Sequence, residues 1–159
     1  MELHGSCHCK KVTFTVMSQT PSPFMRCYCS ICRKTGAGYN INIMGLYKTL
    51  KVNGEGHLRT YRAVRDPETK ELCGNIRYFC SECGCHLYAY NKTYAEYVYP
   101  LASCIDTELP LVEDADSYNI LIKDKASWVT VPKESTHVFD NYPDVSLIDW
   151  HKKNNKLIE

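Results

Sequence analysis

The chain has 159 residues, of which 44% are hydrophobic, and its 19 basic and 18 acidic side chains leave a formal net charge of +1. This length favours one domain or two very small ones, and the near-neutral charge without a basic run argues against nucleic acid as a partner. The apolar runs are too short for a membrane span, and the N-terminus lacks the apolar stretch of a signal peptide. We therefore expect a soluble cytoplasmic protein with no membrane partner.

Alternating β-forming residues predict strands along most of the chain, and twelve tyrosines add to this tendency. The predicted strands are Lys11–Val16, His57–Arg62, Asn75–Phe79, His86–Tyr90, Tyr97–Ala102 and Trp128–Val131. A polar segment, 64–75, reads as a loop between the second and third of these. Only the tail is clearly helical, over about 143–154, with Pro143 and Asp144 at its start and Val145, Ile148 and His151 on one face. The prediction is a mainly β single domain, 1–159, with its core in about 3–131 and short helices.

Ten cysteines are the most unusual feature of the composition. They stand at positions 7, 9, 27, 29, 32, 73, 80, 83, 85 and 104. Disulfides need an oxidising compartment, and no export signal is visible. The C-x-C and C-x2-C spacings instead suit pairs of thiolates that converge on one ion from a tight turn, so zinc is the favoured interpretation.

The cysteines divide into a set of four and a set of three. The first C-x-C precedes a predicted strand, whereas "FCSECG" (79–84) follows one, and adjacent strand ends could bring Cys7, Cys9, Cys80 and Cys83 around one zinc. Four thiolates make a closed, structural site. The segment "CYCSIC" (27–32) then has only three ligands, and its fourth position is either open or filled from elsewhere in the chain, for example by Cys85 or Cys104.

Four segments carry a resemblance to a known family. They are "GSCHCKKVTFTV" (5–16), "CYCSICRKTGA" (27–37), "RYFCSECGCHLY" (77–88) and "YPLASCIDTELP" (99–110). In this order they resemble the glutathione-dependent formaldehyde-activating enzymes, a zinc family with a β-rich fold of the β-tent type. The segments "KASWV" (125–129) and "DNYPDVSLIDWHKK" (140–153) are similar to the fungal branch, and the family includes a vertebrate relative, centromere protein V.

The resemblance implies two zinc ions per chain. Cys7, Cys9, Cys80 and Cys83 would hold a structural zinc, and Cys27, Cys29 and Cys32 a catalytic zinc whose fourth position takes water or a substrate thiol. It also implies a carbon–sulfur lyase that adds glutathione to formaldehyde to give S-hydroxymethylglutathione, and that catalyses the reverse reaction. Two residues depart from the family pattern: Tyr28 stands where a histidine is common, and Cys85 where a small polar residue is usual.

Other residues near the motifs leave alternatives open. Arg33 and Lys34 could offset the negative charge of three thiolates or bind a glutathione carboxylate, or they could be solvated surface charges. Cys73 and Cys104 read as isolated thiols, and His8 as a turn residue.

Two functions other than catalysis are also compatible with the motifs. One is a non-catalytic zinc module that binds protein or chromatin. The other is a glutathione carrier or sensor, which would bind the thiol without turnover.

Overall fold

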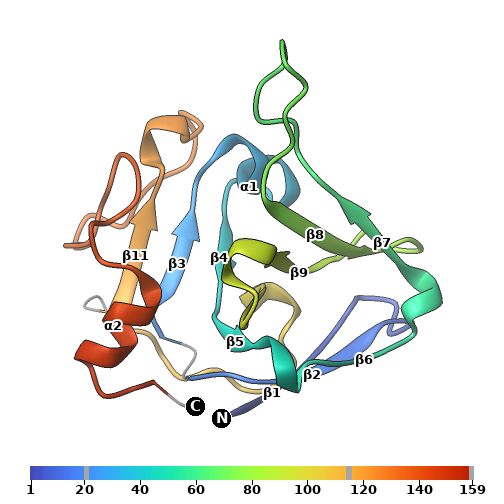
Figure 1. Ribbon diagram of the computed structural model, residues 1–159. Helices are drawn as coiled ribbons and strands as arrows, with labels where there is room; N and C mark the ends of the chain where they lie inside the picture. Colours follow the sequence, from blue (N-terminus) through green and yellow to red (C-terminus); the bar gives the residue numbers. More distant parts are fainter. Residues whose placement is uncertain (20–21, 114–115, 158–159) are drawn as a thin grey trace.

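The computed structural model describes residues 1–19, 22–113 and 116–157, and most of its regular structure lies in three small β-sheets (Figure 1). Sheet A contains, in spatial order, β1 (Glu2–Ser6), β2 (Thr13–Met17) and β6 (Lys51–Asn53). Sheet B contains β5 (Gly45–Leu46), β10 (Tyr97–Pro100), β9 (His86–Asn91), β8 (Asn75–Cys80) and β7 (Leu58–Tyr61). Sheet C contains β11 (Ser117–Ile120), β3 (Phe24–Cys27) and β4 (Asn40–Asn42). The prediction of a mainly β fold is confirmed.

The helices are short. They are α1 (Ser30–Thr35) and α2 (Leu147–Lys153), with 3-10 turns η1 (Tyr47–Thr49), η2 (Glu55–His57), η3 (Lys92–Tyr94), η4 (Ala102–Cys104) and η6 (Ile122–Asp124). Within the described residues, no helix combines the length and the apolar character that crossing a bilayer would require.

The largest part of the core lies between sheets A and B. Along β2 the burial alternates strictly, so Phe14 and Val16 point inward and their neighbours do not. These side chains pack with Leu87 and Val98 of sheet B, and the Phe14 ring meets the Tyr88 ring edge-on at 5.7 Å. Sheet A is thereby fixed on the face of sheet B that carries Tyr88.

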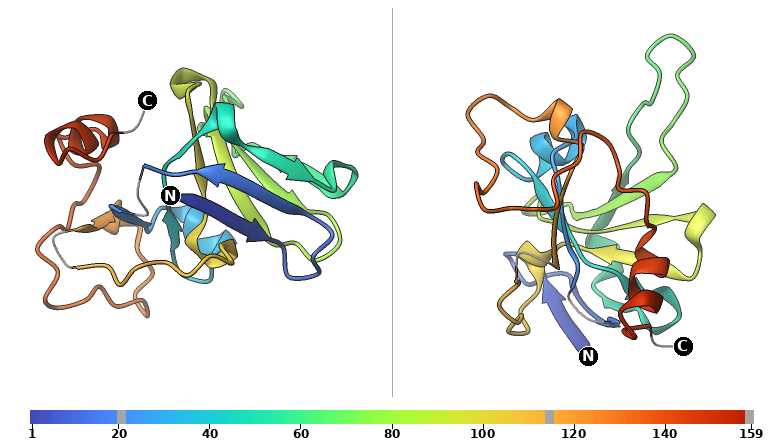
Figure 2. Two further views of the ribbon diagram at one scale, coloured as in Figure 1. Left: turned by 90° about the horizontal axis from the view of Figure 1, so that it is seen from below. Right: turned by 90° about the vertical axis from the view of Figure 1, so that its left-hand side faces the viewer.

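Sheet C joins segments that are far apart in the sequence. Strand β11 runs parallel to β3, with Ile120 opposite Cys27, and β4 pairs antiparallel on the other side of β3. Helix α2 lies beside this sheet and away from sheet A (Figure 2), and its Leu147 packs against the cluster that contains Met25 and Cys27.

Five of the six predicted strands exist, with ends that differ by up to two residues, and the sixth is wrong. Residues Trp128–Val131 form no strand: Val129 N–H bonds to Ala126 O at 3.1 Å, and Lys125 Nζ bonds to Val129 O at 2.6 Å. These bonds close a turn that pairs with no strand of the described residues, and Trp128 is 70% exposed on it.

The C-terminal helix is shorter than expected. It starts after Ser146, whose Oγ accepts from Asp149 N–H at 3.1 Å, so Pro143 and Asp144 do not begin it. Val145 lies outside the helix and is exposed, whereas Trp150 and His151 are its buried residues. The predicted loop 64–75 is largely exposed and projects from the end of sheet B between β7 and β8 (Figure 1).

Candidate metal centres

Four cysteines from two distant turns meet at one edge of the structure. Cys7 and Cys9 follow β1, and Cys80 and Cys83 lie at the end of β8 and in the turn that follows it. Their four sulfur atoms all lie within 4.8 Å of one another. We call these residues the four-cysteine group.

The geometry of the four-cysteine group fits a tetrahedral metal ion. The Cys7 and Cys9 sulfurs are 3.5 Å apart, and those of Cys9 and Cys80 are 3.7 Å apart. Zinc with Zn–S bonds of about 2.3 Å holds tetrahedral sulfurs about 3.8 Å apart. Val12 N–H also points at Cys7 Sγ at 3.3 Å. The donor set and its spacing therefore fit a closed zinc site.

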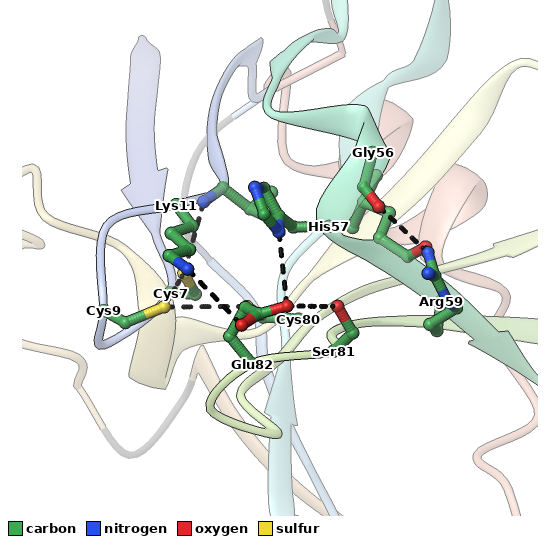
Figure 3. A network of polar contacts seen from close by, with 11 residues as sticks. Cys7, Cys9, Lys11, Gly56, His57, Arg59, Cys80, Ser81 and Glu82 are labelled. Carbon is green, nitrogen blue, oxygen red and sulfur yellow. Dashed lines mark hydrogen bonds and ion pairs between the residues drawn. The ribbon is translucent and has the colours of Figure 1, made fainter.

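Polar contacts tie the turns around the four-cysteine group together on the outside (Figure 3). Glu82 lies between Cys80 and Cys83 and bonds to Lys11 Nζ at 3.3 Å and to His57 Nδ1 at 3.4 Å. The hydrogen bond from His57, together with Lys11, lowers the pKa of Glu82. Because these groups are exposed, the network contributes little stability compared with a metal ion.

The second cluster is formed where β3 turns into α1. Cys27 is the last residue of β3, Cys29 is the N-cap of α1, and Cys32 lies in the first turn of that helix. Cys32 N–H points at Cys29 Sγ at 3.4 Å, so a sulfur occupies the capping position. The three sulfurs lie within 4.8 Å of one another, and we call these residues the three-cysteine group.

Tyr28 fixes the turn between Cys27 and Cys29. Its side chain is fully buried, and its hydroxyl donates to Asn119 Oδ1 of β11 at 2.9 Å. The ring also packs against Ala126 and Val129, in a cluster separate from the one that contains Cys27 and Cys32. Tyr28 is therefore an anchor in the core, which explains how a tyrosine can stand at this position without serving as a ligand.

No fourth side chain of a ligating type completes the three-cysteine group within the described part of the chain. Cys85 is half-buried against the core between sheets A and B, and Cys104 Sγ lies 3.1 Å from the carbonyl oxygens of Leu87 and Leu101. Cys73 lies in the 64–75 loop, and it also belongs to neither group. The alternative of a closed site completed by Cys85 or Cys104 is not supported by this geometry.

The thiols of the three-cysteine group compete for protons. Hydrogen bonds from Cys27 and then Cys32 hold the pKa of Cys29 far below its usual value, while hydrogen bonds with the other two sulfurs raise the pKa of Cys27. Cys29 is half-exposed, whereas Cys27 and Cys32 are buried. Cys29 is thus the most solvent-accessible residue of the group.

Charged side chains near the three-cysteine group differ in exposure. Arg33 is half-buried with a buried Nε that lacks a hydrogen-bond partner, whereas Lys34 is exposed. Sequence reasoning missed Arg77 of β8, which is only 7% exposed. The hydrogen bond to Cys27 lowers the pKa of Cys32, and the charge of Arg77 lowers it least of all. The hydrogen bond to Cys29 and burial outweigh both, so the pKa of Cys32 is raised on balance. Sequence reasoning also missed His86, whose ring is buried near Arg77. The only sequence feature that could have pointed to Arg77 and His86 is their position, with Arg77 shortly before Cys80 and His86 shortly after Cys83.

Comparison with known proteins identifies the family of this chain. Residues 2–120 match the model of the family described as glutathione-dependent formaldehyde-activating enzyme. The chain belongs to this family. It is 42% identical over 156 residues to a protein from Halomonas elongata that is named as a glutathione-dependent formaldehyde-activating enzyme, and the match covers 96% of each chain.

A likeness to a solved structure supports the fold. The crystal structure of a Rhodobacter sphaeroides protein superposes with a TM-score of 0.55 at 24% identity, and it covers 69% of this chain and 92% of that one. The family assignment confirms the resemblance found in the sequence motifs. A relation to fungal members or to centromere protein V stays a prediction.

Proposed function

We propose that the protein is a zinc-dependent carbon–sulfur lyase. It adds the thiol of glutathione, or of a related small thiol, to formaldehyde or another small aldehyde, and it catalyses the reverse cleavage. With formaldehyde the product is S-hydroxymethylglutathione. The four-cysteine group would hold a structural zinc and the three-cysteine group a catalytic one.

The observation that carries this proposal is the difference between the two groups. Four sulfurs saturate a tetrahedral ion, whereas three leave one position for a ligand that does not come from the described chain. The half-exposed Cys29 gives that position a side open to solvent. The family assignment supplies the two substrates that such a position would serve.

When bound there, zinc would offer a free coordination position, ionise a thiol and polarise a nearby carbonyl group. A free thiol is only about 3% ionised at pH 7, so complete ionisation contributes at most about 30-fold, and less because nucleophilicity falls with the pKa. Positioning of thiol and aldehyde by the surrounding side chains must supply much of the remaining rate.

Arg33 and Lys34 of α1 are the candidates for holding a glutathione carboxylate. Arg33 suits this role better, because its half-buried guanidinium has unpaired donor capacity beside the three-cysteine group. Lys34 is exposed, and an exposed ammonium group contributes less to binding.

The test is the exchange rate between glutathione, formaldehyde and S-hydroxymethylglutathione, measured by exchange NMR against a buffer blank because the uncatalysed reaction is also reversible. We expect Cys29→Ser to fold, to keep one zinc per chain and to lose the acceleration over the blank. Cys73→Ser, outside both groups, is the matched control and should keep it.

Two outcomes would contradict the proposal. Full acceleration by Cys29→Ser would show that the three-cysteine group is not catalytic. Wild-type protein that binds glutathione but gives no acceleration would be a carrier or sensor instead of a lyase.

A further inference from the structure

Two polar side chains on the β8–β9 hairpin have buried nitrogen atoms without a hydrogen-bond partner. Arg77 Nη1 and both ring nitrogens of His86 are buried without a hydrogen-bond partner. A buried polar group left unpaired is destabilising, and a charged one is more so. Their presence together indicates a site for an external group.

The two side chains are neighbours on the hairpin, and Arg77 is also near the three-cysteine group. Arg77 and Phe79 point to the same side of β8, and His86 of β9 is directly opposite Phe79. The charge of Arg77 acts both on the His86 ring and on the Cys32 thiol of α1. Arg77 is therefore close to both His86 and the three-cysteine group.

The chemistry of this pair is defined by its protonation. Burial, and then the charge of Arg77, lowers the pKa of His86 to about 4, and a backbone contact with Tyr88 partly opposes this shift. At neutral pH His86 therefore offers one N–H donor and one lone pair. Arg77 adds a charged donor, and no carboxylate of the described chain forms an ion pair with it.

We propose that Arg77 and His86 bind the hydroxyl oxygen of a thiol–aldehyde adduct held at the three-cysteine group. This inference rests on the proposed function and names the part of the substrate that the pair recognises. A hydroxyl group accepts from Arg77 Nη1 and donates to the lone pair of His86. A carboxylate would use the donors alone and leave the lone pair of His86 facing a negative charge, so a hydroxyl is the better complement.

The experiment compares two ligands of equal size, S-hydroxymethylglutathione and S-ethylglutathione, in which a methyl group replaces the hydroxyl. Titration calorimetry of the zinc-loaded full chain should give a Kd for the hydroxymethyl ligand that is about 10-fold to 100-fold lower, as a charge-assisted hydrogen bond provides. Arg77→Met and His86→Phe should each bring this ratio close to one and leave the affinity for S-ethylglutathione within about threefold.

The control variant is Arg59→Met on the neighbouring strand β7. Arg59 is exposed and donates to the Gly56 and Leu58 carbonyl oxygens, so its removal should keep the wild-type ratio. A measurement on the wild-type protein needs no variant: the ring nitrogen signals of His86 in 15N NMR should move with S-hydroxymethylglutathione and stay in place with S-ethylglutathione.

The other outcomes overturn the inference in distinguishable ways. If Arg77→Met weakens both ligands equally, Arg77 binds a carboxylate. If it lowers the zinc content while the ratio persists, Arg77 balances the charge of the thiolates. If the wild-type protein binds the two ligands with nearly equal Kd values but still accelerates the exchange reaction, this inference is wrong and the proposed function stands. A wild-type protein that binds neither ligand and gives no acceleration removes the proposed function with it.

Discussion

Replacing Cys80 by serine should destabilise the protein far more than the same change at Cys29. A metal in the four-cysteine group connects Cys9 to Cys80, which are 71 positions apart, whereas the three-cysteine group spans only Cys27 to Cys32. The loop-closure relation for a cross-link gives about 4 kcal/mol for the long loop and about 2 kcal/mol for the short one. The difference arises because the longer loop restricts the unfolded chain more.

The assay is thermal unfolding followed by circular dichroism, with the zinc content of each sample measured in parallel. For a chain of this size about 4 kcal/mol corresponds to a fall in Tm of about 10 °C, and the Cys29→Ser value should be about half of that. Cys104→Ser is the control, because Cys104 is buried but belongs to neither group.

Two results would refute this reasoning. A soluble Cys80→Ser protein with the wild-type Tm would show that the four-cysteine group is not a structural metal site. A fall in Tm of the same size in Cys104→Ser would show that the loss comes from placing a hydroxyl in the core and not from losing the cross-link.

Two further predictions follow from the sites. Metal analysis of freshly purified protein should find two zinc ions per chain. A chelator should remove the ion of the three-cysteine group first, because one of its coordination positions exchanges. A result of one zinc or none, with cysteines paired as disulfides, would contradict the division into two groups. Tyr28→Phe should cost about 1 kcal/mol, because the buried hydrogen bond to Asn119 is lost, and an unchanged denaturant midpoint would show that this bond is dispensable.

The grouping of the cysteines could be predicted because short spacings are a local property. Cys27, Cys29 and Cys32 occupy one strand end and one helix turn, so their proximity follows from six consecutive residues. Prediction of the four-cysteine group also required the assumption that the strand ends next to its two cysteine pairs are adjacent. The structure places the four sulfurs together.

Elements that depend on distant partners were harder to predict. Strand β11 is only four residues long and exists because it pairs with β3, which precedes it by about ninety residues. Helix α1 was missed because a cysteine caps it, in place of the serine, threonine or aspartate that usually signals a helix start. Trp128–Val131 has strand-forming side chains, but no partner strand lies beside it among the described residues.

The unpaired nitrogens of Arg77 and His86 could not be predicted at all. An arginine on a predicted strand is expected to face solvent, and a histidine at the start of a strand can face either solvent or core, so the burial of these nitrogens follows only from the folded structure.

The order of the cysteines along the chain has a consequence for biosynthesis. The three-cysteine group lies inside the loop that the four-cysteine group closes, and its last residue, Cys32, is made 48 positions before Cys80. During translation the local set is therefore complete while Cys7 and Cys9 still lack their partners. The four-cysteine group can therefore form only after β8 and its turn have emerged, whereas the three-cysteine group can form earlier.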